Sequence, residues 1–210
     1  MSSTKDPEAP KPTSGFSRRG FLQGVGVSGG AIGTGILESE AQAQTPAGVI
    51  SGETAVTLQI NGKPYKATVE PRVTLLDVMR NSLDLTAAKR VCDRGTCGAC
   101  TVIVDGKATY ACTILAIDAQ GKKIETLEGI AQGRNPHPIV NAFVENDAQQ
   151  CGYCTPGFVV AAKAFLDRTP NPSYEQVKEG LGGNFCRCGT YVGIRKAVMD
   201  AAKARGGRNA

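Results

Sequence analysis

Eight cysteines restrict what this chain of 210 residues can fold into more than any other feature of its sequence. They form two sets: the first is Cys92, Cys97, Cys100 and Cys112, and the second is Cys151, Cys154, Cys186 and Cys188. Both sets lie among glycines and not on apolar helix or strand faces, where ordinary buried cysteines are found. Each set therefore indicates a place where four sulfur atoms converge.

The first set has the spacing of a known ligand loop. Three of its cysteines follow the pattern C-x4-C-x2-C, with Cys112 farther along, as around the [2Fe-2S] cluster of plant-type ferredoxins. Gly95 and Gly98 permit the backbone angles of a tight wrap, and the amides of residues 94–96, 98 and 99 can point at the sulfurs. The sequence predicts one [2Fe-2S] cluster here.

The second set consists of two close pairs, each placed just before a predicted helix. Cys151 and Cys154 precede a helix that Thr155 is predicted to cap, and Cys186 and Cys188 precede one that starts at Thr190. Helix N-termini favour an anionic cluster and lower the pKa of nearby thiols. Two helix starts that face each other would form a second buried [2Fe-2S] site.

Two other uses of the cysteines stay open at this point. Their even number fits disulfides in an exported protein, but a chain of this length with 41% hydrophobic residues buries a core without such cross-links. Zinc accepts four thiolates, so the second set alone fits a zinc site. The spacing of the first set favours iron.

The pattern after residue 43 predicts two domains and an α+β fold class. Residues 53–130 alternate as strands, with turns at Asn61-Gly62 and Asp105-Gly106, a strand over Lys107–Thr113 after the second turn, and one helix capped by Thr74. This pattern predicts a small mixed sheet packed on one helix, as in a ferredoxin-like β-grasp domain. Residues 134–205 predict an all-α four-helix [2Fe-2S]-binding domain, with a capping box at Ser173. Residues 128–136 are the predicted linker.

Residues 1–43 have the order of a twin-arginine signal peptide. Arg18 and Arg19 precede a weakly apolar, glycine-rich stretch, and Ala41-Gln42-Ala43 supplies a small-residue cleavage site. The alternative is a flexible tail in which two arginines adjoin by chance. The apolar stretch is too short to span a bilayer. We expect a periplasmic mature protein, exported folded and without a membrane span.

Composition argues against nucleic acid as a partner, and the sequence offers few candidates for a catalytic residue. The net charge is +5, aromatic residues make up 5%, and lysines and arginines are dispersed, so no nucleic-acid surface is expected. The single histidine, His137, lies between prolines and is predicted to be a solvated loop residue rather than a ligand. No catalytic residue of the chain's own is expected. Tyr153 and Phe158 are predicted to pack in the core, the alternative being anchors of an interface.

Three motifs resemble those of a known family. The segments CDRGTCGAC at 92–100, QCGYCTPG at 150–157 and NFCRCGTY at 184–191 look like the [2Fe-2S] subunit of the xanthine oxidase or molybdenum hydroxylase family. The resemblance runs from about Thr54 to Ala202. With the paired arginines, the chain looks most like the iron-sulfur subunit of a periplasmic aldehyde oxidoreductase.

The resemblance implies a heterotrimer that oxidises aldehydes to carboxylic acids. A large subunit would hold a molybdenum pterin cytosine dinucleotide, and a medium subunit would hold FAD. Electrons would pass from molybdenum to the helical-domain cluster, then to the ferredoxin-like cluster, and on to FAD. The resemblance also implies that Gln150 hydrogen-bonds the pterin and that Cys188 is the ligand nearest to it. The alternatives are the same relay in a purine or N-heterocycle hydroxylase, and a free-standing ferredoxin-like carrier.

Overall fold

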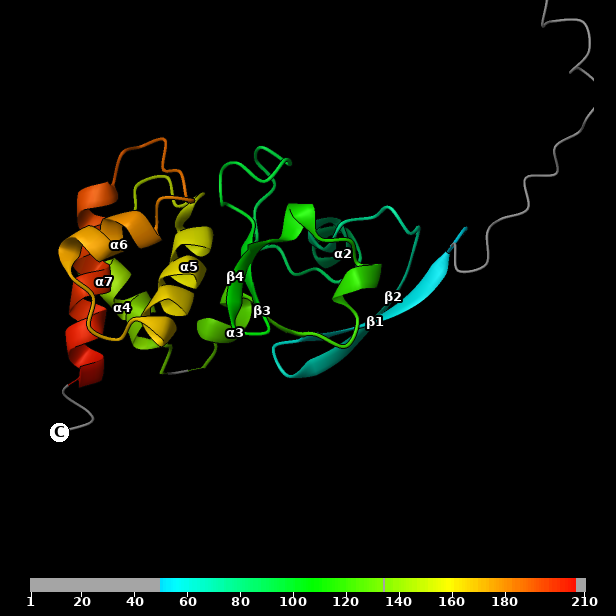
Figure 1. Cartoon of the computed structure of the whole chain (residues 1–210), viewed down its shortest axis with the longest axis horizontal. Coiled ribbons are helices and arrows are strands. Elements are labelled where there is room, and N and C mark those ends of the chain that lie inside the picture. Colours follow the sequence, from blue (N-terminus) through cyan, green and yellow to red (C-terminus); the bar gives the residue numbers. More distant parts are fainter. Residues whose placement is uncertain (1–49, 134, 207–210) are drawn as a thin grey trace, which may run out of the picture. The chain divides into compact units, whose positions relative to one another are not determined.

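A computed structural model describes residues 50–133 and 135–206, and it places a small mixed sheet and a set of helices along this part of the chain (Figure 1). The predicted α+β class is confirmed. The predicted signal peptide, residues 1–43, lies outside the described residues. Within the described residues, no helix is both long enough and apolar enough to cross a membrane.

The sheet has five strands in the order β2-β1-β5-β3-β4. Its strands are β1 (Thr54–Ile60), β2 (Lys63–Val69), β3 (Thr101–Val104), β4 (Lys107–Tyr110) and β5 (Lys123–Glu125). The hairpins β1-β2 and β3-β4 are antiparallel, whereas β5 lies parallel to β1 and antiparallel to β3. Val56, Leu58 and Ile60 are buried, as their alternation predicts. Asn61 takes a φ of 51° in the predicted turn.

Helix α2 (Leu75–Asn81) packs on this sheet. The Thr74 hydroxyl accepts a hydrogen bond from the amide of Asp77 at 3.2 Å, which confirms the predicted cap. The helix buries Leu75, Leu76, Val78 and Met79 against β1, β3 and β5. This core includes Cys100, directly before β3, and Cys112, in the turn after β4.

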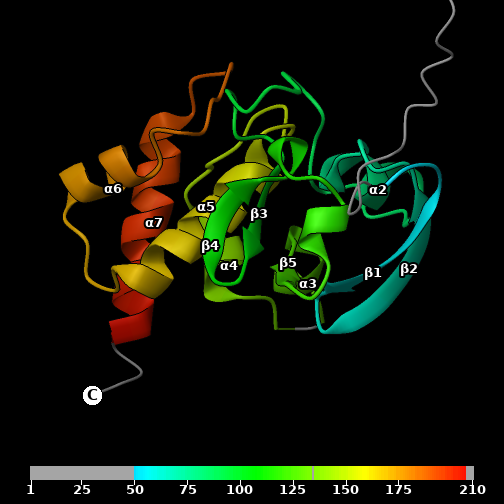
Figure 2. The same cartoon turned by 45° about the vertical axis from the view of Figure 1, so that its right-hand side comes forward.

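The helical part begins with the short α3 (Leu127–Ile130) and continues with α4 (Pro138–Glu145), α5 (Thr155–Arg168), α6 (Tyr174–Gly180) and α7 (Tyr191–Gly206). The predicted capping box at Ser173 and Gln176 is present at the start of α6. Helix α5 is the central element, because it packs against α4 and α7 on one side and against β3 and β4 on the other (Figure 2). The core of the helices accordingly includes Ile103 of β3.

Three local predictions were wrong. Strand β4 ends at Tyr110, so Cys112 lies in a 3₁₀ turn, Ala111–Thr113, and not on a strand. Residues 127–130 form α3, which overlaps the start of the predicted linker, because Leu127 and Ile130 pack against the helical core. Helix α5 is capped not by Thr155 but by the backbone of Cys154, whose carbonyl accepts from the amide of Phe158.

His137 is part of a helix cap and not a solvated loop residue. It is the N-cap of α4, where its Nδ1 accepts a hydrogen bond from the amide of Ile139 at 3.3 Å. Pro138 occupies the first position of the helix, where its missing N–H costs nothing. The prolines on both sides of His137 therefore mark a helix start.

Candidate functional site

The β3-β4 hairpin brings the two ends of the first cysteine set together. Cys100 directly precedes β3 and Cys112 closely follows β4, and Thr101 pairs with Tyr110 in the register of the two strands. The amide of Ala111 donates to the carbonyl of Cys100 at 3.2 Å. Cys100 and Cys112 are buried, whereas Cys92 and Cys97 are half-buried on the loop that leads into β3.

Backbone N–H groups of this loop point at sulfur atoms. The amide of Gly95 donates to Cys112 Sγ at 3.3 Å, and the amide of Thr96 donates to Cys92 Sγ at 3.4 Å. The Thr96 hydroxyl is the main reason that the pKa of Cys92 falls to about 6, with further help from the amides of Arg94 and Thr96 and from Cys97. These hydrogen-bond donors stabilise the thiolate form of the cysteine, and they would also stabilise the negative charge of a cluster bound to the sulfur.

Burial and neighbouring sulfurs act in the opposite direction on Cys100. Its burial, followed by the effects of Cys112 and Cys97, raises the pKa of the Cys100 thiol to about 12. Four thiolates so close together repel one another unless cations lie between them. The donor set therefore fits a site whose negative charge is offset by bound metal.

Two glycines of the loop have no room for a side chain. Gly95 has a φ of +73°, and a Cβ there would lie 2.8 Å from Thr113 Cγ2. Gly98 has a φ of +70°, and a Cβ there would lie 2.6 Å from Asn184 Nδ2. Positive φ and close packing explain why the wrap uses glycine at both positions, as predicted.

The second cysteine set lies at the starts of α5 and α7. Cys154 is the N-cap of α5, and Cys186 is buried five residues before α7. Burial, followed by Cys186 and Cys151, raises the pKa of Cys154 to about 12. For Cys186, burial raises the pKa, but hydrogen bonds from Thr190 and others outweigh it and lower the pKa to about 7. Three of the predicted ligands, Cys151, Cys154 and Cys186, therefore interact.

The remaining predicted residues of this site lie at the surface. Cys188 is exposed, as are Cys151 and Gln150. Tyr191, at the start of α7, holds the backbone at Cys186 in place, because its hydroxyl accepts a hydrogen bond from the Cys186 amide at 2.9 Å. Part of the second site thus faces outward, whereas much of the first is covered.

A cavity of about 580 Å³ opens onto both cysteine sets. It is lined by Cys97 of the first set, by Cys151, Cys154 and Cys186 of the second, and by Val91, Thr96, Ala99, Tyr153, Phe185, Arg187 and Tyr191. Tyr153 is 50% exposed and its hydroxyl donates to the carbonyl of Arg90 at 3.4 Å, so the prediction that it packs in the core was wrong. Phe158 is buried in the core, as predicted.

Sequence reasoning missed the residues that join the two cysteine loops. Asn184 is 7% exposed and donates to the carbonyl of Gly98 at 2.9 Å. The Phe185 amide donates to the carbonyl of Cys97 at 2.9 Å, and the Tyr110 hydroxyl donates to the carbonyl of Gly183 at 2.8 Å. The only sequence signal was that Asn184 and Phe185 lie in a motif immediately before Cys186.

Each cysteine set offers four free thiols, which is the number of ligands that one [2Fe-2S] cluster takes. The candidate holders are the first set for one cluster and the second set for the other.

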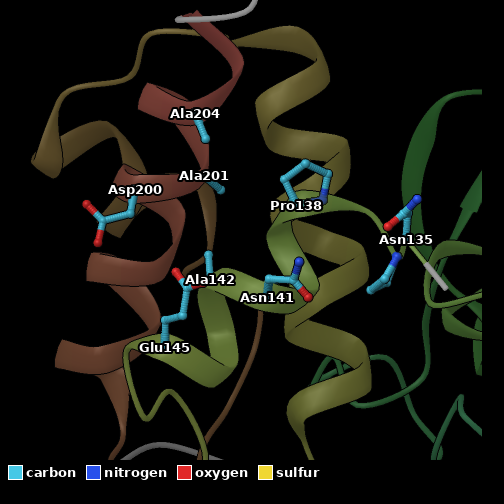
Figure 3. Close-up of a pocket in the computed structure, with 9 residues that line it drawn as sticks. Asn135, Pro138, Asn141, Ala142, Glu145, Asp200, Ala201 and Ala204 are labelled. Atoms are coloured by element: carbon cyan, nitrogen blue, oxygen red, sulfur yellow. The ribbon is translucent and has the colours of Figure 1, made fainter.

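A further cavity, of about 620 Å³, lies between α4 and α7, away from both cysteine sets. Asn135, Asn141 and Glu145 line it from the side of α4, and Asp200, Ala201 and Ala204 line it from α7 (Figure 3). None of its lining residues is a cysteine, so it is separate from the candidate metal sites.

Comparison with known proteins matches each half of the described chain to a family of iron-sulfur domains. Residues 58–125 match the family model described as a 2Fe-2S iron-sulfur cluster binding domain, and residues 126–199 match one described as a [2Fe-2S] binding domain. The chain is 47% identical over 153 residues to a nicotinate dehydrogenase subunit of Pseudomonas putida, covering 73% of this chain and 98% of that protein.

Two further comparisons agree. The chain is 39% identical over 181 residues to the aldehyde oxidoreductase iron-sulfur-binding subunit PaoA of Escherichia coli, covering 79% of this chain and 78% of that protein. It matches a chain of the crystal structure of quinoline 2-oxidoreductase from Pseudomonas putida 86 with a TM-score of 0.71 and 40% identity, covering 76% and 98% of the two chains. The chain belongs to the family of [2Fe-2S] iron-sulfur subunits of molybdenum hydroxylases.

Proposed function

We propose that this chain is the electron-transfer subunit of a molybdenum-dependent oxidoreductase, in which it relays electrons from a molybdenum cofactor subunit to a FAD subunit. The observation that supports this best is the pairing of two four-cysteine sets, joined by the hydrogen bond from the Phe185 amide to the Cys97 carbonyl. Bound in these sites, [2Fe-2S] clusters would supply reversible one-electron chemistry. The catalytic activity belongs to the complex.

The residues of the chain would perform three tasks. The eight cysteines would hold the clusters, all eight remaining predicted ligands. The amides of Gly95 and Thr96 would stabilise the negative charge on sulfur. The buried positions of Cys100 and Cys112 would keep water away from part of the first site. The proposed division is a β-grasp domain over residues 53–130 for one cluster and a four-helix domain over residues 134–205 for the other.

The exposed face of the second site is the proposed entry point for electrons. Gln150, Cys151 and Cys188 are exposed there. We assign Gln150 as the residue that hydrogen-bonds the pterin of the large subunit, with Cys188 as the nearest ligand. Electrons would then leave through the first site toward the FAD subunit. The complex would be a heterotrimer.

An aldehyde is the proposed substrate of the complex, and an N-heterocycle is the second candidate. The alignment with the aldehyde oxidoreductase subunit PaoA covers 79% of this chain, more than the 73% covered with the nicotinate dehydrogenase subunit. The second candidate is favoured by the higher identity to the nicotinate dehydrogenase subunit, 47% against 39%. Among the described residues, neither cysteine site adds a catalytic base that would select between them.

We also propose that the complex is periplasmic. The support is the order of Arg18, Arg19, the glycine-rich stretch and Ala43 in the sequence. A twin-arginine route suits a protein whose clusters must be inserted before export.

Affinity purification of the tagged chain from its native cells tests the proposal. We expect about four irons per chain, with molybdenum and FAD in two co-purifying subunits. The purified complex is then assayed with an aromatic aldehyde and with nicotinate, using an artificial electron acceptor. A monodisperse iron-containing chain without partners would instead indicate a free-standing carrier. A colourless preparation without iron would indicate a disulfide or zinc protein.

A further inference from the structure

Asn184 joins the loop that leads into Cys186 to the loop that contains Cys97 and Cys100. Its Nδ2 donates to the carbonyl of Gly98 at 2.9 Å and to the hydroxyl of Thr101 at 3.2 Å. Asn184 is 7% exposed and Thr101 is 2% exposed, so both bonds are shielded from water. A buried amide that lost these partners would leave polar groups unsatisfied.

The orientation of this amide is fixed by its partners. The Gly98 carbonyl can only accept, so the group that faces it must be the NH₂ of Asn184 and not its oxygen. The same carbonyl also accepts from the Thr101 hydroxyl at 2.6 Å and from the Thr101 amide at 3.1 Å. Three donors therefore converge on one peptide group, which lies between Cys97 and Cys100.

The surroundings leave little freedom at this contact. A Cβ on Gly98 would lie 2.6 Å from Asn184 Nδ2, and one on Gly157 of α5 would lie 2.4 Å from the Gly98 carbonyl oxygen. The Gly98 peptide is thus enclosed by the 183–186 loop on one side and by the first turn of α5 on another. Both of these segments carry ligands of the second site.

We propose that Asn184 is a positioning residue that fixes the separation and orientation of the two cysteine sites relative to each other. This inference rests on the proposed electron relay. Asn184 is not a ligand, and it acts through the Gly98 peptide. Its side chain would hold both ligand loops in one geometry while electrons pass between the sites.

The spin–spin interaction between the two reduced clusters measures this geometry. In the reduced, cluster-loaded full chain, two paramagnetic centres at a fixed separation give a resolved splitting in low-temperature EPR spectra. We expect Asn184→Leu to keep about four irons per chain and both signals, but to lose the resolved splitting, because a range of separations replaces one. Asn184→Gln, which keeps the amide, should restore part of it.

Asn146→Leu is the matched control. Asn146 also donates through Nδ2, to the Ala142 carbonyl at 3.0 Å and to Asp200 at 3.2 Å, but its partners belong to α4 and α7 and not to a cysteine loop. It should keep the splitting unchanged. Unchanged splitting in a loaded Asn184→Leu chain would overturn the proposal.

If Asn184→Leu loses iron, Asn184→Asp takes its place in the experiment. Aspartate has the same size as asparagine but lacks the NH₂ group that donates to Gly98 and Thr101. Loss of iron in that variant too would overturn the proposal, because Asn184 would then retain a cluster and not set a separation. Failure of the proposed relay itself is distinguishable: the unmodified chain would then lack iron or one of the two signals.

Discussion

Gly157, in the first turn of α5, lies directly against Gly98 in the first cysteine loop, and a Cβ at position 157 would come within 2.4 Å of the Gly98 carbonyl oxygen. The same Cβ would meet the Ala99 backbone at 3.1 Å. Because these neighbours are backbone atoms, they cannot move aside as a flexible side chain would. Helix α5, whose N-cap is Cys154, therefore packs so closely on the loop of Cys97 that there is no room for a side chain at position 157.

We expect Gly157→Ala to destabilise the chain by about 1 to 3 kcal/mol, as overpacking of a tight contact does. Helix propensity acts in the opposite direction and would stabilise the same variant by about 0.5 to 1 kcal/mol. The free energies of unfolding of Gly157→Ala and of Gly182→Ala, measured in urea, show whether overpacking or helix propensity dominates. Gly182→Ala serves as control because a Cβ added there would lie 3.1 Å from its nearest neighbour, the Glu179 carbonyl oxygen, so the overlap is smaller than at Gly157. A more stable Gly157→Ala chain would contradict the close contact.

Local patterns predicted much of the fold because each depends on neighbours in sequence. The alternation of Val56, Leu58 and Ile60, the cap at Thr74 and the capping box at Ser173 are all present. Strand ends were predicted less well, since the turn at Cys112 and the helix at Leu127 depend on packing against other elements.

The cysteine sets were readable from the sequence, but the link between them was not. Spacing and glycines identify a ligand loop, because those requirements are local. The bond from Asn184 to Gly98 joins residues 86 positions apart, so no periodicity or spacing indicates it. Exposure of Tyr153 was missed for the same reason, because it depends on where the loop before α5 meets Arg90.

An ion-pair network links the sheet to two helices and makes stability depend on pH. Asp167 of α5 bonds Lys163 at 2.9 Å and Arg205 of α7 at 2.8 Å, while Lys163 also pairs with Glu125 of β5 at 3.1 Å. Partial burial raises the pKa of Asp167, but the bonds from Lys163 and Arg205 outweigh it, so the net shift is downward from 3.8.

A carboxyl with a lowered pKa in the folded state stabilises the fold above its unfolded pKa, and this contribution is lost as the pH falls through the folded pKa. We expect the loss of unfolding free energy caused by Asp167→Asn to be larger at pH 7 than at pH 3.5. Chemical unfolding of both chains at the two pH values measures this difference. Glu175→Gln is the control, because Glu175 forms an exposed pair with Lys178 and should show little dependence. Equal losses at both pH values would contradict the network.

Export of the complex depends, in our proposal, on both arginines of the predicted signal. Arg18→Lys with Arg19→Lys keeps the charge and changes only the side chain, so the complex should be folded and active but remain in the cytoplasm. Cell fractionation with activity staining shows where it is. Lys5→Arg with Lys11→Arg, earlier in the same segment, is the control and should be exported. Periplasmic activity of the double lysine variant would reject the signal.

The ligand assignment predicts reciprocal losses when one cysteine is replaced in each set. Cys97→Ser should remove the EPR signal of one reduced cluster and Cys186→Ser that of the other, because a serine hydroxyl is a far weaker ligand than a thiolate. Iron should fall from about four to about two per chain in each case. Thr113→Ser, beside Cys112 and exposed, should keep both signals. If both replacements removed the same signal, or neither removed one, the two sets would not be separate cluster sites, and a relay through this chain would have no physical basis.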